Sequence, residues 1–286
     1  MFIGTEKLTH TYMPGTPFAN EALKEVTFQL KKGEIALVIG PSGSGKSTLI
    51  QHLNGLLKPT SGQVLFEGRT VGSDKAELLK LRKRIGLVFQ MPEEQFFSET
   101  VYDEVAFAPR NLGFAENEVQ TSVTGALQEV GLDPDALLDR HPFQLSSGQK
   151  RLVALAAVLS FKPEVLILDE PTAGLDSFSR ANLFNLLAVL NRNTGLTILI
   201  CTHHLDEAAA LAETVFVLKQ GRLVLNGPTS EIFSKREQLH KLGLGLPAVT
   251  EIMYWLAEEG LDVRTDIYTL EGARQEINKL KGRQEK

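Results

Sequence analysis

The feature that most constrains the fold of this chain is a glycine-rich loop, Gly40-Pro41-Ser42-Gly43-Ser44-Gly45-Lys46-Ser47-Thr48. The apolar segment Glu34–Ile39 before it is typical of a buried strand, and the segment Lys46–Gly55 is typical of a helix. Glycines let backbone N–H groups wrap phosphates, and a helix presents its positive end to them. We therefore expect nucleoside triphosphate binding, with Lys46 on the β- and γ-phosphates and the Ser47 hydroxyl on Mg²⁺.

Apolar and amphipathic segments alternate along the chain, which predicts an α/β fold with a mainly parallel sheet. Core strands are expected at Glu34–Ile39, Ile85–Phe89, Val165–Leu168, Thr197–Cys201 and Val215–Leu218. Strands of a flanking antiparallel layer are expected at Leu23–Leu30 and Val64–Glu67. Helices are expected at Lys46–Gly55, Glu116–Val130, Gly148–Ser160, Ser179–Arg192, Leu205–Ala212, Leu246–Glu258 and Leu270–Leu280. We expect one domain over residues 1–230, a helical lobe at about 91–160 within it, and an accessory or dimerisation region over 231–286.

Composition excludes several classes of protein. The formal charge of −5 implies no broad basic face for nucleic acid. The single cysteine, Cys201, cannot form an internal disulfide, which fits a reducing, cytosolic setting. Apolar runs fall far short of the roughly 20 residues that span a bilayer. We expect membrane contact to come through a partner.

Two carboxylates follow an apolar segment at Val165–Leu168. Asp169 is the candidate to hold Mg²⁺, because a hard cation prefers oxygen ligands. Glu170 stands one residue on and is the candidate general base for the attacking water.

A further glycine-serine turn, Leu145-Ser146-Ser147-Gly148-Gln149, opens an expected helix upstream of these carboxylates. We interpret it as a second phosphate-contacting surface, one that serves a nucleotide held by another subunit. This predicts a dimeric ATP-driven machine.

Together these motifs resemble the nucleotide-binding subunit of an ATP-binding cassette (ABC) transporter over roughly residues 1–230. Leu145–Gln149 matches the family signature except that Ser147 replaces its usual second glycine. The resemblance implies that Ser146, Gly148 and Gln149 contact the ATP of the opposite subunit. It also implies that Gln90 senses Mg²⁺ and water, and that Asp176, in Ala173-Gly174-Leu175-Asp176, lies in the loop through which the subunits communicate.

The resemblance assigns two further residues to the site. His203, after the expected strand Thr197–Cys201, corresponds to the switch histidine on the γ-phosphate, with His204 beside it as the competing choice. Tyr12 stands where the family places the aromatic residue that stacks on adenine.

Four segments of the chain are similar to the ATPases of energy-coupling factor (ECF) transporters, which import vitamins or transition-metal ions. They are Tyr12-Met13-Pro14-Gly15-Thr16-Pro17-Phe18, Gln51-His52-Leu53-Asn54-Gly55-Leu56-Leu57, Met91-Pro92-Glu93-Glu94-Gln95-Phe96-Phe97-Ser98-Glu99-Thr100-Val101 and Asp103-Glu104-Val105-Ala106-Phe107. The likeness is to the second of two paralogous ATPases of the vitamin-importing type.

That resemblance implies a second ABC ATPase, with a heterodimer favoured, a transmembrane coupling subunit, a substrate-binding membrane subunit and a peripheral place on the cytoplasmic face of the membrane. It implies a groove in which arginines of the coupling subunit meet acidic residues, for which the candidates are Glu93, Glu94, Asp103 and Glu104. Phe96 and Phe97 are candidates for the apolar part of that groove, and anchoring of the helical lobe is their alternative role. Two alternatives stay open: a soluble ABC ATPase acting in DNA repair or on the ribosome, and a regulatory, weakly hydrolysing subunit to which Ser147 is the hint.

Overall fold

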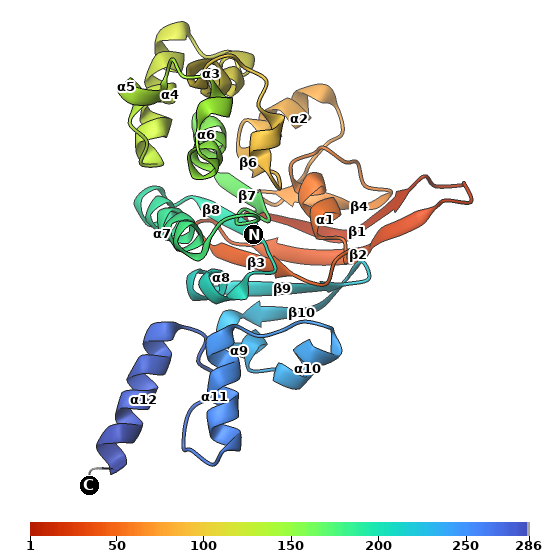
Figure 1. The fold of residues 1–286 in the computed structure, drawn as a ribbon. Helices are drawn as coiled ribbons and strands as arrows, with labels where there is room; N and C mark the ends of the chain where they lie inside the picture. The colour runs from red at the N-terminus through yellow and green to blue at the C-terminus, as the bar shows by residue number, and fades with distance from the viewer. Residues whose placement is uncertain (285–286) are drawn as a thin grey trace.

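A six-stranded, mostly parallel sheet occupies the middle of the molecule (Figure 1). The computed structural model describes residues 1–284, with side chains described as far as residue 280. The strands, in spatial order, are β10 (Arg222–Pro228), β9 (Thr214–Lys219), β3 (Ile35–Ile39), β8 (Thr197–Cys201), β7 (Val165–Asp169) and β6 (Ile85–Val88). Only β10 runs antiparallel to its neighbour. Every residue of β3, β7 and β8 is buried, as expected of parallel strands covered on both faces.

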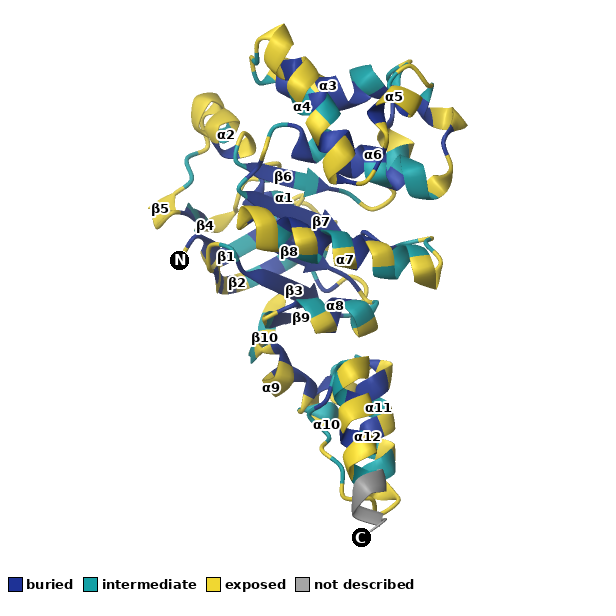
Figure 2. Ribbon diagram, turned by 90° about the vertical axis from the view of Figure 1, so that its left-hand side faces the viewer, coloured by how far each residue is buried: buried dark blue, intermediate teal, exposed yellow. Residues whose placement is uncertain are grey.

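Different layers cover the two faces of this sheet (Figure 2). One face packs against α1 (Lys46–Leu53) and a four-stranded antiparallel sheet. The strands of that sheet, in spatial order, are β2 (Asn20–Leu30), β1 (Ile3–Tyr12), β4 (Ser61–Phe66) and β5 (Arg69–Thr70). The other face packs against α7 (Ser177–Thr194), α8 (Leu205–Leu211) and a helical lobe. The carboxyl ends of β3, β7 and β8 therefore meet at one edge, where ligands of such sheets bind.

The helical lobe lies above the sheet in Figure 1 and follows β6 in the chain. Its elements are the 3-10 helix η1 (Pro92–Gln95), α3 (Val101–Asn111), α4 (Glu116–Glu129), α5 (Pro134–Leu137), the 3-10 helix η2 (Pro142–Gln144) and α6 (Ser147–Leu159). Val105, Val123 and Val153, from α3, α4 and α6, are fully buried against one another and the main core. The packed valines fix the lobe to β6 and β7 through α6.

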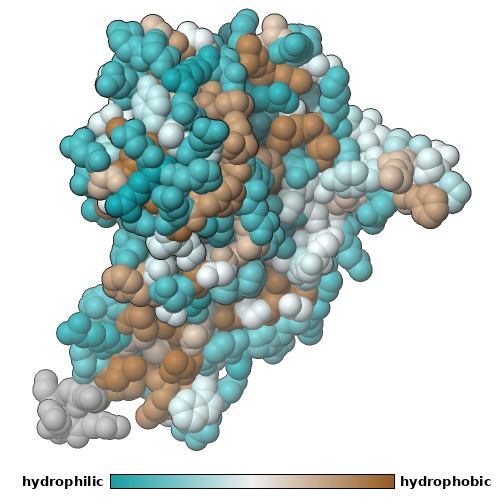
Figure 3. Space-filling view, turned by 45° about the horizontal axis from the view of Figure 1, so that its top comes forward, coloured by the Kyte–Doolittle hydropathy of each residue, from teal (hydrophilic) through white to brown (hydrophobic). Residues whose placement is uncertain are grey.

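Four helices end the chain: α9 (Thr229–Phe233), α10 (Arg236–Lys241), α11 (Ala248–Glu258) and α12 (Leu270–Gln284). Phe233, Leu239 and Leu246 still belong to the main core, whereas α11 and α12 share a separate small cluster around Met253. Figure 3 shows apolar surface gathered over these last helices. The domain boundary near residue 230 stays a prediction, but core packing continues as far as Leu246.

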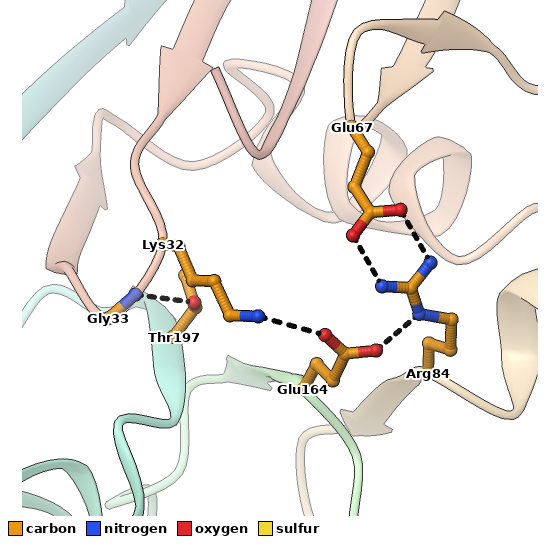
Figure 4. Close-up of polar contacts among 6 residues, drawn as sticks. All are labelled: Lys32, Gly33, Glu67, Arg84, Glu164 and Thr197. Atoms are coloured by element: carbon orange, nitrogen blue, oxygen red, sulfur yellow. Dashed lines mark hydrogen bonds and ion pairs between the residues drawn. The ribbon is translucent and has the colours of Figure 1, made fainter.

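A ladder of charged side chains joins the two sheets at the edge opposite the phosphate loop (Figure 4). The Arg84 guanidinium, just before β6, donates to both carboxylate oxygens of Glu67, at 2.7 and 2.8 Å, and also to Glu164. Lys32 reaches the other oxygen of Glu164 at 3.4 Å. The hydrogen bond from Arg84 is the main cause that lowers the pKa of Glu164.

The expected α/β fold with a mainly parallel sheet is confirmed, and each expected strand and helix occurs with small shifts at its ends. Among the elements that the sequence patterns missed are β1, α2 (Lys75–Arg82) and β10. Only Leu81 of α2 is buried, and β10 is an edge strand without a buried residue, so neither has a clear apolar face. Among the described helices, none has the length and apolarity needed to cross a membrane.

Candidate functional site

The glycine-rich loop runs from the end of β3 into α1, as the sequence predicts. Gly45 adopts a φ of 104°, and a Cβ there would lie 2.6 Å from the Ala22 carbonyl oxygen, so only glycine fits. The Lys46 ammonium donates to the carbonyl oxygens of Gly40 at 2.8 Å and Pro41 at 3.2 Å. The lysine is thereby folded back over the loop, where it can exchange these carbonyls for phosphate oxygens.

A cavity of about 740 Å³ opens above the loop. Its lining brings together these residues: Tyr12, Asn20, Glu21, Ala22, Lys24, Ser42, Gly43, Ser44, Gly45, Lys46, Ser47, Thr48, Gln90, Asp169, Glu170, Gln220 and Gly221. The volume falls within the range of cofactor and substrate sites. Sequence reasoning missed the start of β2 and the turn Gln220–Gly221, which only tertiary structure places here. The turn's Gly221 N–H donates to the Ser44 carbonyl oxygen at 3.0 Å and so supports the loop.

Tyr12 lies at the end of β1 and lines this cavity. Its hydroxyl is 3.1 Å from the Thr48 hydroxyl, which ties it to α1. The ring meets the His10 ring edge to face, with centroids 4.5 Å apart. With 38% of its surface exposed, the tyrosine keeps a face free for a planar ligand.

Asp169 ends β7 and is buried beside the phosphate loop. Burial raises the pKa of its carboxyl, while a hydrogen bond from the Ser47 hydroxyl opposes that rise. Asp169 and Ser47 thus form a hydroxyl–carboxylate pair at the place where the sequence predicts Mg²⁺.

Glu170 and His203 form a polar pair at a cavity that residues of the phosphate loop also line. Glu170 Oε2 lies 2.8 Å from His203 Nδ1 and also accepts from the His203 backbone N–H at 3.3 Å. Glu170 has a φ of 45°, which is costly for a residue with a side chain. Its N–H donates to the Cys201 carbonyl oxygen at 2.7 Å, so the end of β8 holds this conformation. Glu170 lines the cavity above the loop.

His204, the competing choice, lines neither cavity, although its ring lies 4.2 Å from the His203 ring. It precedes α8, and its N–H donates to the Thr202 hydroxyl at 3.0 Å. Burial lowers the pKa of its imidazole, and the neighbouring His203 adds to the effect. The geometry favours His203 as the residue that meets the nucleotide.

A second cavity of about 500 Å³ continues past the loop. Gln90, Glu170 and His203 line it together with Lys46. The segment 243–245, which follows α10, also reaches this cavity. Nothing in the sequence marks that segment as part of a site, because its position depends on how the chain end packs.

The turn Leu145–Gln149 begins α6, and its residues line neither of these cavities. The Ser146 hydroxyl accepts from the Gln149 N–H at 3.2 Å, and the Gln149 side chain accepts from the Ser146 N–H at 3.1 Å, which is a capping box. Ser147 is exposed at the first helical position. Asp176 caps α7 in the same way, accepting from the Ser179 N–H at 2.8 Å.

The residues predicted to meet a membrane partner divide into two groups. Glu94 is exposed on η1. The other three carboxylates have partners within the chain. Glu93 pairs with Arg151, and Asp103 pairs with Thr100 and Arg110. Glu104 accepts hydrogen bonds from the N–H groups of Phe97 and Ser98.

Phe96 is buried in the main core, where it anchors the lobe. Phe97 is 64% exposed and packs edge to face on Phe107 at 4.7 Å. Of the two phenylalanines considered for the groove, Phe97 therefore lies on an exposed apolar surface with Phe107, whereas Phe96 anchors the lobe.

Comparison with known proteins gives concordant results. A family model described as ABC transporter matches residues 23–173. The chain is 46% identical over 277 residues to the energy-coupling factor transporter ATP-binding protein EcfA2 of Clostridium acetobutylicum, covering 97% of both chains. It is 48% identical over 268 residues to EcfA2 of Symbiobacterium thermophilum, covering 94% of this chain and 92% of the relative.

Solved structures agree. CbiO1 from Clostridium perfringens, described as part of the ABC transporter complex cbiONQ, superposes with a TM-score of 0.75 at 40% identity, over 88% of this chain and 98% of that one. The ATP-binding cassette MJ0796, as a dimer bound to ADP and phosphate, superposes with a TM-score of 0.72 at 30% identity, over 80% of this chain and 99% of that one.

Proposed function

Since this chain belongs to the ABC transporter family, we propose that it is the ATP-hydrolysing subunit of an energy-coupling factor importer for a vitamin or a transition-metal ion. The chain has the ABC ATPase fold and is an ATPase that binds ATP. The observation that carries the proposal is one cavity in which Lys46, Asp169 and Glu170 converge. The transport role is inferred from the names of relatives that match this chain along nearly their whole length.

The residues of the site fit Mg²⁺. The Ser47 hydroxyl, the Asp169 carboxylate and the Gln90 amide are oxygen donors, which that ion prefers. Among the described residues, no group of three His, Cys, Asp or Glu could hold a metal ion without other ligands. Nucleotide phosphates would supply further oxygen ligands of the ion. Ser47, Asp169 and Gln90 would hold Mg²⁺, which would neutralise the charge that develops on the phosphates.

Hydrolysis then needs little covalent chemistry from the protein. Lys46 leaves the Gly40 carbonyl for the phosphates, Glu170 orients and deprotonates the attacking water, and His203 contacts the γ-phosphate. The adenine stacks on Tyr12.

The signature surface at Ser146, Gly148 and Gln149 completes a site held by a second ABC ATPase. Supporting this is its position away from the chain's own nucleotide cavities. Contacts to the γ-phosphate favour the closed dimer, and their loss on hydrolysis reopens it. Asp176 belongs to the loop through which the two sites communicate.

We favour a heterodimer at the cytoplasmic face of the membrane, joined to a transmembrane coupling subunit and a substrate-binding membrane subunit. Ser147 supports asymmetry, because a side chain stands where close approach of the backbone is wanted. The same observation supports a second candidate function, a regulatory subunit whose composite site turns over slowly. Glu94 and the exposed Phe97 form the surface proposed to meet the coupling subunit.

The test is to purify the tagged chain from its native membranes in mild detergent and identify its companions by mass spectrometry. We expect a second ABC ATPase, a multi-span membrane subunit and a substrate-binding membrane protein. The matched control is the variant Phe97→Asp. It should lose the membrane subunits and keep the second ATPase, because Phe97 is exposed and its substitution leaves the core unchanged. Recovery of the chain alone, or with ribosomes or DNA, would remove the transport assignment and leave the ATPase.

A further inference from the structure

A buried arginine in α6 connects three segments of the site. Arg151 is only 4% exposed. Its Nη2 donates to the Ala173 carbonyl oxygen at 2.9 Å and to Glu93 Oε1 at 3.2 Å. One nitrogen atom thus joins the helix of the signature, the segment after Gln90, and the loop that ends at Asp176.

The pairing between Arg151 and Glu93 is incomplete. Within the described residues, Arg151 Nε and Nη1 have no hydrogen-bond partner, and neither has Glu93 Oε2, although all three atoms are buried. A guanidinium matches a carboxylate with two parallel N–H donors, and here one side of each group is unused. Burial lowers the pKa of Arg151, and Glu93 opposes that shift, which is the mark of a buried charge with partial compensation. Because both side chains keep unpaired polar atoms, a small movement would bring a second N–H of Arg151 to the free oxygen of Glu93.

The packing around Arg151 leaves room for that arrangement. A cavity of about 300 Å³ lies between α6 and α7, lined by Arg151 and Leu152 on one side and by Leu183 and Leu186 on the other. This cavity opens to solvent, so α6 and α7 are not close-packed against each other here and α6 has room to shift. Leu175, in the loop before Asp176, lines the same cavity and would move with it.

A second arginine holds the same loop from the other side and serves as a comparison. Arg180 donates to the Leu175 carbonyl oxygen at 3.1 Å and to the Ser177 hydroxyl at 3.0 Å. Its Nε lies 3.6 Å from Glu207 on α8. Arg180 therefore braces the loop against α8, whereas Arg151 links the loop to the segment after Gln90.

We propose that Arg151 is a positioning residue for ATP hydrolysis, which it supports by setting the distance between the Gln90 segment and the Ala173–Asp176 loop. In the nucleotide-bound state its guanidinium engages both carboxylate oxygens of Glu93. The inference rests on the ATPase activity and is independent of the transported solute. It gives Glu93 a partner within the chain, beside its proposed place near the membrane subunit.

The test compares Arg151→Gln with wild type in the assembled complex purified from membranes. We expect kcat for ATP to fall about 10- to 100-fold, because a misplaced loop costs catalysis more than it costs binding. The Kd of a fluorescent ATP analogue should stay close to the wild-type value, whereas the Tm should fall, because Glu93 is left buried without its partner; kcat is therefore expressed per folded molecule. A variant with wild-type kcat, or one whose kcat falls only in proportion to lost folded protein, would overturn the proposal. Absence of hydrolysis by wild type would instead count against the proposed function itself.

Two further comparisons separate positioning from simple stabilisation. Arg151→Lys keeps the charge but not the planar fork, so it should recover little of the lost kcat. Full recovery by lysine would overturn the two-oxygen pairing.

A double-mutant cycle tests the partner. The loss in Arg151→Gln/Glu93→Gln should be smaller than the product of the two single losses by at least about threefold, since the two side chains are in contact. The matched cycle with Arg180→Gln in place of Arg151→Gln should be multiplicative, because Arg180 bonds to other partners. Multiplicative losses in both cycles would overturn the Glu93 pairing.

Discussion

At the scale of single residues, the chemistry depends on a carboxylate held in a strained backbone conformation. Glu170 combines a φ of 45° with a 2.8 Å contact to His203 Nδ1. We predict that Glu170→Gln keeps ATP binding and lowers steady-state ATPase activity about 10²- to 10⁴-fold, because the amide cannot accept a proton from water. Binding of a fluorescent ATP analogue and phosphate release by the assembled complex measure the two effects.

Glu237→Gln provides the control for this substitution, since it makes the same change on an exposed side chain of α10 outside the nucleotide cavities. ATPase activity of Glu170→Gln at the wild-type rate would show that another group activates the water.

His52 gives a pH-dependent contribution to stability. Its Nδ1 lies 2.7 Å from the Thr48 carbonyl oxygen and its Nε2 lies 3.1 Å from His10 Nδ1. Burial lowers the pKa of His52 below its ordinary value of 6.5. The unfolded chain therefore binds a proton that the folded chain resists, so stability is full above pH 6.5 and falls as the pH drops below it.

We predict that His52→Gln loses less Tm than wild type does when the pH is lowered from about 7.5 to about 5.5, since the variant lacks the titrating group. Differential scanning calorimetry at the two pH values measures the change. An equal loss of Tm in both proteins would mean that other groups account for the acid sensitivity.

The sequence predicted residues whose chemistry follows from local pattern. The phosphate loop, Asp169 and the Glu170–His203 pair lie in one site because each follows a strand of the same parallel sheet. Arg151 and the turn Gln220–Gly221 could not be predicted, because their roles depend on contacts between distant segments.

At the scale of elements, the joint between the helical lobe and the sheet depends on a glycine in β6. A Cβ on Gly86 would lie 2.3 Å from Val158 Cγ1 on α6. We predict that Gly86→Ala destabilises the protein by about 1–3 kcal/mol, because the added methyl overpacks this joint. Urea unfolding measures the loss.

The compensating change is available on the facing helix. Val158→Ala removes the clashing methyl groups, so the double variant Gly86→Ala/Val158→Ala should be more stable than Gly86→Ala alone. A double variant that is less stable than both single variants would place the strain elsewhere.

Elements with a strong apolar period were predictable, whereas α2 and β10 were not. Only Leu81 of α2 is buried, so tertiary contacts at one end hold a helix that is exposed along most of its length. Asp74 caps it, accepting from the N–H groups of Ala76 and Glu77, and this cap was the one available sequence signal.

At the scale of the whole molecule, the last two helices form an appendage with its own small core. Tyr254 and Arg236 tie α11 back to the body, through a hydrogen bond to the Ser234 carbonyl oxygen and ion pairs with Glu251 and Glu258. Trp255 remains 57% exposed on this appendage. A large exposed aromatic residue on such a small core is typical of an association surface.

We predict that deleting residues 248–286 leaves the nucleotide site intact and weakens association with the second ATPase subunit. The cut spares Phe233, Leu239 and Leu246, which belong to the main core, whereas a cut at 231 would remove them and confuse loss of association with loss of folding. Trp255→Glu is the companion variant, because it alters the surface without shortening the chain. Sedimentation equilibrium measures association, and binding of a fluorescent ATP analogue reports the site. If both variants associate as wild type does, the cassette domains alone hold the dimer and the appendage serves another contact.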